Sequence, residues 1–218
     1  MKIAVALPRD TVEVSAVLEG PADPWAAVIL AHGAGSGMEH PFLVGLAGAL
    51  NGAGIATLRF TFPYREAGRR LPGPAAHAIA TWRAVRDRAA DLVDAPLWAA
   101  GKSYGGRMAS MAAAEDGFAV EGLVYLGYPF HPPGQPEKTR GVHLSTIQEP
   151  QLFLSGADDP FIQPRADFER VVAGCPDGHL HALPAAGHSF EVKGARRPAD
   201  EIGASLAPML TGFVRARS

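Results

Sequence analysis

The chain has 218 residues, a formal net charge of −2, and hydrophobic residues at 47% of its positions. This length and apolar content suffice for one domain with a sizeable core, so we expect residues 1–218 to form a single domain. The near-neutral charge argues against a nucleic-acid partner, because such a partner needs a strongly basic face. Small molecules or other proteins are the expected partners.

The only cysteine, Cys175, rules out an intramolecular disulfide, and secretion gains no support from it. The apolar run at the N-terminus stops at Pro8, which is too early for the core of a signal peptide. The longest apolar run, residues 25–31, is far shorter than the roughly 20 residues that cross a membrane. We therefore predict a cytoplasmic protein that does not associate with membranes, and the sequence leaves its oligomeric state open.

The first segments alternate between strand-like and helix-like patterns. Residues 2–6 and 11–18 are rich in Val and Ala and are separated by a turn, which predicts an antiparallel pair. Residues 25–31 form an apolar run that predicts a strand covered on both faces. A helix is predicted at about 41–51, and a strand at 55–60.

The same alternation continues to the C-terminus. Further strands are predicted at 97–101, 121–127, 151–155 and 178–183, with helices at about 74–92, 104–114, 164–174 and 198–215. Eight strands joined mostly by helical crossovers predict a mostly parallel sheet, with the second strand antiparallel and helices on both faces. No stretch is long enough for a cap domain.

A candidate nucleophile follows the strand at 97–101. Residues 101–106 read Gly-Lys-Ser-Tyr-Gly-Gly, which fits the G-x-S-x-G pattern of a tight strand-to-helix turn. The turn places Ser103 at a helix N-terminus, where backbone N–H groups favour negative charge. The alternative is a plain glycine turn without chemistry. Lys102 is best explained as a solvated lysine beside the turn.

His188 is the candidate base, because it lies in a short loop after the strand at 178–183, near the edge where sites of open α/β folds gather. A histidine with a pKa near 6.5 can take the proton of a serine hydroxyl. His179 and His181 alternate along the strand and read as pleat residues, and a metal pair there would lack a third ligand. No metal site is therefore predicted.

The carboxylate that orients the base is expected at the end of the strand at 151–155. Two adjacent aspartates, Asp158 and Asp159, lie in the turn there. We favour Asp159, with Asp158 capping the turn or facing solvent. The chain order of serine, aspartate and histidine is then one of the known orders of a serine-histidine-acid triad.

If such a serine attacks a substrate carbonyl, negative charge develops on the carbonyl oxygen. This acyl transfer needs hydrogen-bond donors for the resulting oxyanion. The N–H of Tyr104, directly after the nucleophile, is one candidate, and the N–H of Ala34 is the other. Ala34 lies in the glycine-rich loop of residues 32–37. That loop lacks the Gly-Lys-Ser/Thr ending of a phosphate-binding loop, which disfavours a nucleotide site.

Six motifs together resemble the α/β-hydrolase superfamily over nearly the whole chain, and most closely its small, lidless dienelactone-hydrolase-like branch. They are AHGAG (31–35), LRFTFPY (58–64), GKSYGGR (101–107), GYPFHPP (127–133), GADDPF (156–161) and GHSF (187–190). The resemblance implies the α/β-hydrolase fold and supports the aspartate before proline, Asp159, as the acid. It also extends to a subgroup that includes a subunit of a histone-acetylating complex.

The resemblance implies a serine hydrolase, of the carboxylesterase or thioesterase kind, that cleaves a small ester or thioester through an acyl-enzyme without a cofactor. Dienelactone hydrolases proper use a cysteine nucleophile, so a diene-lactone substrate does not carry over to Ser103. Because a fold does not fix a function, the alternative is a non-catalytic protein-interaction module on the same fold.

Three residues are candidates for substrate contact. Arg59 opens an arginine-rich segment that would suit an anionic substrate, although a solvated basic loop is the simpler explanation. Tyr128 and Phe130 follow the strand at 121–127 and would form apolar walls, unless they pack at the edge of the core.

Overall fold

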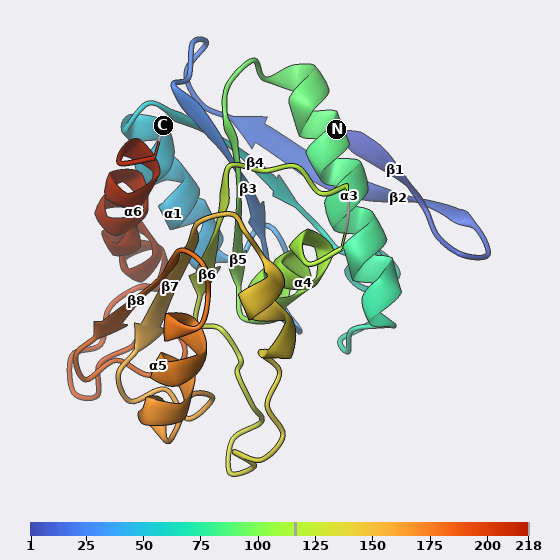
Figure 1. The fold of residues 1–218 in the computed structure, drawn as a ribbon. Coiled ribbons are helices and arrows are strands. Elements are labelled where there is room, and N and C mark those ends of the chain that lie inside the picture. Colours follow the sequence, from blue (N-terminus) through green and yellow to red (C-terminus); the bar gives the residue numbers. More distant parts are fainter. Residues whose placement is uncertain (116, 218) are drawn as a thin grey trace.

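An eight-stranded sheet runs through the centre of the computed structural model, which describes residues 1–115 and 117–217 (Figure 1). The strands are β1 (Lys2–Ala6), β2 (Thr11–Glu19), β3 (Ala26–Ala31), β4 (Ile55–Phe60), β5 (Leu97–Lys102), β6 (Gly122–Leu126), β7 (Gln151–Gly156) and β8 (Gly178–Leu183). Their order is β1-β2-β4-β3-β5-β6-β7-β8. Strand β2 runs antiparallel to β1 and β4, and the other pairs are parallel, which confirms the predicted sheet.

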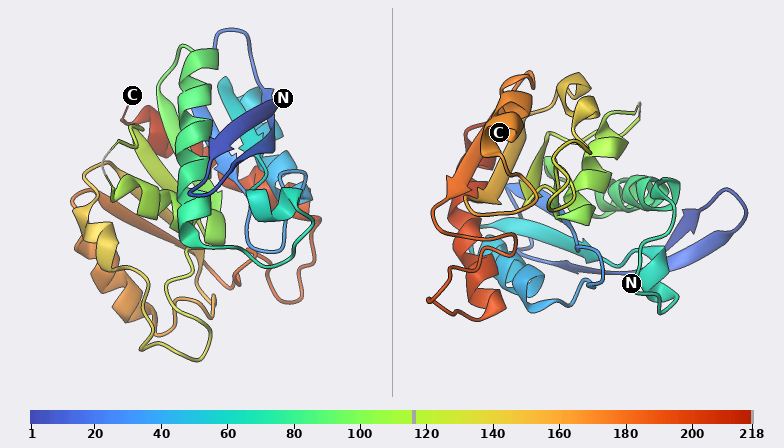
Figure 2. Two further views of the ribbon diagram at one scale, coloured as in Figure 1. Left: turned by 90° about the vertical axis from the view of Figure 1, so that its right-hand side faces the viewer. Right: turned by 90° about the horizontal axis from the view of Figure 1, so that it is seen from below.

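Helices cover both faces of the sheet, as predicted (Figure 2). Helices α1 (Pro41–Gly52) and α6 (Ala199–Arg215) pack on one face. The other face is covered by α3 (Ala75–Leu92), α4 (Tyr104–Ala113) and α5 (Arg165–Ala173). No separate cap domain is evident in the ranges that the structure describes.

The apolar patterns account for these positions. All six residues of β3 and all six of β4 are buried, because helices cover both faces of the central strands. In α3, Ile79, Trp82 and Val85 lie at helical spacing and pack into the core between this helix and the sheet.

Two short helices were not predicted. The four-residue α2 (Pro63–Glu66) follows β4, and a 3-10 helix, η1 (Val142–Thr146), lies before β7. Both are too short to show helical periodicity in the sequence. Both lie in segments expected to be loops, so the sheet order is unaffected.

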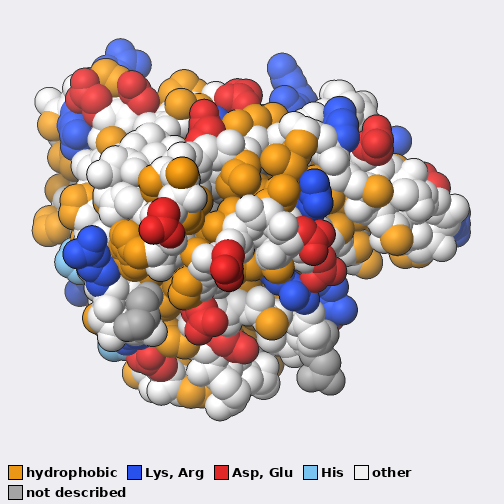
Figure 3. Space-filling model, turned by 90° about the horizontal axis from the view of Figure 1, so that it is seen from above, with side chains coloured by type: hydrophobic (Ala, Val, Ile, Leu, Met, Phe, Trp, Pro, Cys, Tyr) orange, Lys and Arg blue, Asp and Glu red, His pale blue; other side chains and the backbone are white. Residues whose placement is uncertain are grey.

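The surface offers little sign of an extended charged interface on the side seen from above, where acidic and basic side chains are interspersed (Figure 3). Within residues 1–115 and 117–217, no helix combines the length and apolar character that a bilayer crossing requires.

Candidate active site

Ser103 sits on the tight turn between β5 and α4. Its backbone has φ of 48° and ψ of −113°, a conformation that costs free energy for any residue except glycine. A Cβ at Gly101 would collide with the backbone nitrogen of Gly106, and one at Gly105 would lie 2.6 Å from the His32 carbonyl oxygen. The small residues of the motif are thus required for strand and helix to pass so close.

The three predicted catalytic side chains lie together at the carboxyl ends of the strands. The Nε2 atom of His188 lies 2.9 Å from the Ser103 Oγ, and its Nδ1 atom lies 2.7 Å from the Asp159 Oδ2. With its proton on Nδ1, the imidazole donates to the carboxylate and accepts from the hydroxyl. The fully buried Asp159 is held by the N–H of Phe161, 2.9 Å from Oδ1, whereas Asp158 is exposed.

The environment keeps His188 neutral at neutral pH. Burial lowers the pKa of its imidazole below the ordinary 6.5, and the nearby Lys102 ammonium lowers this pKa further. The hydrogen bond and charge of Asp159 oppose these effects only in part. The Phe161 ring lies against the imidazole, with 4.2 Å between ring centroids. A partly buried, neutral imidazole is free to accept a proton from Ser103.

A cavity of about 460 Å³ opens beside Ser103. Its lining comes from the loop after β3, from α1, from the nucleophile turn, from the loops after β7 and β8, and from the start of α6. The lining residues are Gly33, Ala34, Ser36, His40, Phe42, Leu43, Lys102, Ser103, Phe161, His188, Ser189, Glu191, Ala199 and Ile202.

The two predicted oxyanion donors border this region. Ala34 lines the cavity together with Ser103, and a Cβ on the neighbouring Gly33 would lie 3.8 Å from the Ser103 Cβ. Tyr104 is the first residue of α4, so its N–H has no acceptor within the helix. Both backbone groups are therefore near the nucleophile.

The sequence interpretation missed His32, which fixes the loop that carries Ala34. Its fully buried ring makes an Nδ1 hydrogen bond to the Gly33 carbonyl at 2.8 Å and accepts from the N–H of Phe62 at 3.1 Å. Burial lowers the pKa of His32 to about 4. The neutral imidazole thus ties the start of the loop to the segment after β4. Its position directly after a buried strand was the only available signal.

Lys102 is not the solvated lysine that we expected. Its Nζ donates to the His188 carbonyl oxygen at 2.7 Å. Burial lowers the pKa of this ammonium group to about 8. No pattern in the sequence pairs residue 102 with residue 188, so this contact emerges only from the fold.

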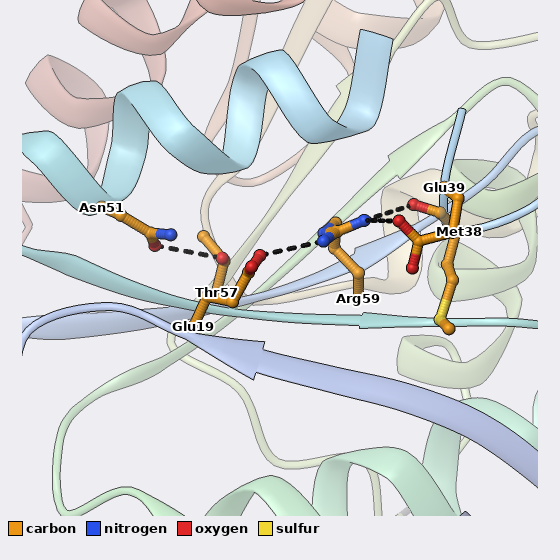
Figure 4. A network of polar contacts seen from close by, with 6 residues as sticks. All are labelled: Glu19, Met38, Glu39, Asn51, Thr57 and Arg59. Carbon is orange, nitrogen blue, oxygen red and sulfur yellow. Dashed lines mark hydrogen bonds and ion pairs between the residues drawn. The ribbon is translucent and has the colours of Figure 1, made fainter. Parts of the chain in front are cut away.

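Arg59 does not reach the cavity. Its buried guanidinium donates to the Met38 carbonyl at 2.7 Å, and it forms ion pairs with Glu39 at 3.0 Å and Glu19 at 2.9 Å (Figure 4). These contacts occupy the side chain and tie the loop before α1 to the sheet. The position of Arg59 therefore does not support the expected contact with substrate, and the side chain is not part of a solvated basic loop.

Tyr128 and Phe130 also lie away from the cavity. The buried Tyr128 donates its hydroxyl to the Arg140 carbonyl at 2.8 Å. The ring of Phe130 packs against Phe168 and faces a separate hollow on the side of η1 and α5. Their apolar surface stabilises the core and its edge, so these positions do not support a role in substrate binding either.

Candidate metal ligands are scattered. In the part of the chain that the structure describes, no three His, Cys, Asp or Glu side chains are grouped as a metal site would need. The exposed His179 instead contacts Asp177 and Arg217. The buried Cys175 contacts the Val171 carbonyl, and burial raises the pKa of its thiol.

The strand order, the strained serine after β5, and the acid and histidine after β7 and β8 are those of the α/β-hydrolase class. A model of the alpha/beta hydrolase domain family matches residues 24–206, and the chain belongs to this family.

Solved structures share the fold over the whole chain. A dienelactone hydrolase from Anabaena variabilis is 23% identical, with a TM-score of 0.76, over 100% of this chain and 97% of that chain. XC6422 from Xanthomonas campestris, described as a serine hydrolase without a lid, is 22% identical, with a TM-score of 0.72, over 99% and 94%. Est1E from Butyrivibrio proteoclasticus, with ferulic acid bound, is 16% identical, with a TM-score of 0.75, over 98% and 99%. The chain is thus dienelactone-hydrolase-like in fold.

Proposed function

We propose that this chain is a serine hydrolase that cleaves an ester or thioester bond of a small substrate. We assign the activity to one domain of residues 1–218, of which Asp116 and Ser218 lie outside the described residues. One observation carries the proposal: Ser103, His188 and Asp159 form a continuous hydrogen-bonded chain at the edge of a cavity of about 460 Å³.

In the first half of the reaction, the Ser103 Oγ attacks the substrate carbonyl while His188 Nε2 takes the hydroxyl proton. The 2.9 Å separation of these two atoms supports this role. Asp159 holds the imidazole and stabilises its protonated form. Collapse of the tetrahedral intermediate breaks the bond to the alcohol or thiol, which leaves with the proton from His188.

In the second half, His188 takes a proton from water, and the resulting attack on the acyl-enzyme releases the acid and restores Ser103. Both tetrahedral intermediates carry negative charge on the former carbonyl oxygen. The backbone N–H groups of Ala34 and Tyr104 are the proposed donors to this oxygen. Each is expected to lower the activation free energy by about 3 kcal/mol.

The cavity favours a substrate with an apolar group of modest size. Phe42, Leu43 and Ile202 contribute apolar walls from α1 and α6. The ferulic acid bound to Est1E is a small aromatic acid, which fits the same substrate class. We therefore propose a carboxylesterase- or thioesterase-like specificity for small apolar acyl or alcohol groups.

The direct test is covalent labelling with a fluorophosphonate, which reacts with activated serines. We expect the wild-type protein to be labelled, Ser103→Ala to remain unlabelled, and Ser189→Ala, which alters another hydroxyl in the cavity lining, to be labelled at the wild-type rate. Turnover of p-nitrophenyl esters of increasing acyl length, neutral and carboxylated, would then define the specificity.

The pH profile tests the base. Because His188 must be neutral, kcat/KM should rise with pH through an apparent pKa below the ordinary histidine value of 6.5 and level off by neutral pH. A profile flat from pH 4 to 8 would count against His188. A folded wild-type protein that is neither labelled nor active would favour the interaction module instead.

A further inference from the structure

Lys102 links the two segments that carry the nucleophile and the base. It is the last residue of β5 and directly precedes Ser103, and its Nζ lies 2.7 Å from the backbone oxygen of His188. The two residues are 86 positions apart in the chain. This hydrogen bond therefore fixes the base-bearing loop relative to the nucleophile turn.

The surroundings of the ammonium group are built to hold it. Nζ lies 5.3 Å from the centroid of the Phe190 ring and 5.9 Å from that of Phe42, positions that suit cation–π attraction. A Cβ at Gly127 would lie 3.2 Å from Nζ and 3.0 Å from the His188 oxygen, so a larger residue there would crowd the contact.

Asp159 and His188 interact electrostatically with this ammonium group, and two further titratable side chains line the same cavity. Burial lowers the pKa of the Lys102 ammonium group to about 8, and the charge of Asp159 opposes this shift only in part. The charge of Lys102 in turn lowers the pKa of the His188 imidazole. His40 and Glu191 line the same cavity from the start of α1 and from the loop after β8. With a pKa of about 8, the ammonium remains mostly charged at pH 7.

The loop that carries His188 needs such an anchor. Its backbone is strained on both sides of the histidine, with φ of 56° at Ala185 and 63° at Phe190. Conformations of this kind persist only where surrounding contacts determine them. Within the loop, Gly187 N–H bonds to the Glu191 oxygen, and Phe190 N–H bonds to the Gly187 oxygen. A charged donor on the His188 carbonyl adds a contact from outside the loop.

We propose that Lys102 is a positioning residue: its ammonium group holds the His188 carbonyl and thereby keeps the imidazole aligned with Ser103 and Asp159. The catalytic part of this inference rests on the proposed serine-hydrolase function. The anchoring itself does not, since the hydrogen bond and the loop geometry exist without substrate.

The anchoring is tested in the wild-type protein by NMR of ¹⁵N-lysine-labelled protein. Of the four lysines in the chain, Lys2, Lys138 and Lys193 are exposed. We expect one slowly exchanging ammonium signal, that of Lys102, and assign it by its persistence in variants of the other three. If all four ammonium groups exchange at similar rates, the proposal is overturned, whatever the protein does to esters.

The consequence for the loop is tested with Lys102→Met, which keeps an apolar stem and removes the donor. Amide hydrogen exchange at Gly187 and Phe190 should become at least about tenfold faster, because the loop loses its anchor. Lys193→Met, at an exposed lysine in the segment beyond the loop, should leave both amides unchanged. Unchanged exchange in a folded Lys102→Met protein would contradict the anchoring role.

The consequence for turnover separates this inference from the proposed function. In Lys102→Met, kcat should fall about 10- to 100-fold with KM changed less than threefold, since alignment and not substrate binding is lost. Lys102→Arg keeps a charged donor and should restore part of kcat. An active Lys102→Met enzyme with wild-type kcat and pH profile overturns the positioning role, whereas an unlabelled, inactive wild type overturns the hydrolase proposal alone.

Discussion

Asp158 and Asp159 are neighbours in the chain but lie in opposite environments. Asp159 is fully buried and bonds His188, whereas Asp158 is exposed. In Asp159→Asn, the amide group would face Nδ1 and favour the imidazole tautomer that cannot accept the Ser103 proton. We expect kcat to fall about 10³- to 10⁴-fold, against less than about twofold for Asp158→Asn. Steady-state kinetics measure kcat in both variants. A larger loss in Asp158→Asn than in Asp159→Asn would identify Asp158 as the acid.

The buried His32 makes stability depend on pH. Its pKa is lowered from 6.5 to about 4, chiefly by burial, so between these values the unfolded chain binds a proton that the folded protein does not. The contribution of neutral His32 to the free energy of unfolding is fully present above pH 6.5. As the pH falls to about 4, about 3 kcal/mol of this free energy is lost.

This loss is measured by urea unfolding of the wild type and His32→Gln at pH 7 and pH 4. The glutamine cannot titrate but can still accept from the Phe62 N–H. The unfolding free energy of the wild type should therefore fall more over this range, by about 2–3 kcal/mol, than that of the variant. Equal losses would show that His32 is not the group responsible.

Among single residues, those that the neighbouring sequence identifies could be predicted. Ser103 follows a buried strand within a glycine motif, and Asp159 and His188 follow later strands in the expected chain order. Lys102 and Arg59 could not be assigned, because their partners come from other parts of the fold. An isolated sequence motif does not reveal where a long, flexible cation will direct its charge.

The loop of residues 33–40 depends on contacts from other elements. Arg59, on β4, binds Met38 and Glu39 at the C-terminal end of this loop. An ion pair between Arg59 and Glu19 on β2 completes the network (Figure 4). The side chain of Arg59 is only 4% exposed, so water cannot replace these partners freely. We call these contacts of Arg59 with Met38, Glu39 and Glu19 the tether. The tether holds one end of the loop that carries Ala34, the proposed oxyanion donor.

Arg59→Met keeps the buried stem and removes the tether. We expect an unfolding free energy lower by about 2–3 kcal/mol, from the loss of charged hydrogen bonds, and a kcat lower by about tenfold as the Ala34 N–H loses its fixed position. Chemical denaturation and ester turnover measure the two effects.

Glu39→Gln is the matched control, because its side chain is 64% exposed and the amide retains an acceptor. Its effect on stability should stay below about 1 kcal/mol. A stable Arg59→Met protein with wild-type kcat would mean that the loop holds its geometry without the tether.

Elements with a long apolar pattern were predicted almost to their ends, as for β4 and for α3 with its buried face. The patterns failed for α2 and η1, since one or two turns contain too few residues for a period to emerge. Helix α2 begins at Pro63 and η1 follows a proline-rich loop, so local turn geometry and contacts with the core determine the backbone in both segments.

On the scale of the whole molecule, the order of the strands in the sheet determines which helices meet at the cavity. Helices α1 and α6 belong to opposite ends of the chain, yet both pack on the face formed by β3, β5 and β6 (Figure 2). Phe42 from α1 and Ile202 from α6 thereby meet in one cavity lining. Periodicity predicts each helix but not their adjacency, which depends on the order in which strands pair.

The two helices approach so closely that a side chain would not fit between them. A Cβ at Gly203 would collide with the Phe42 carbonyl oxygen, and one at Gly45 would collide with the Asp200 carbonyl. Because the contact is between backbones, neither side can yield by changing a rotamer. The separation of α1 and α6 consequently sets the width of the apolar part of the cavity.

Gly203→Ala should push α6 away from α1, lowering the unfolding free energy by about 1–3 kcal/mol and raising KM for apolar esters as the Phe42 and Ile202 walls separate. Gly212→Ala, in the same helix with no heavy atom within 4 Å of the added Cβ, should be neutral or stabilising by up to about 1 kcal/mol. Urea unfolding and KM for a butyrate ester compare the pair. If both alanine variants are equally stable with the same KM, the close helix contact does not shape the cavity.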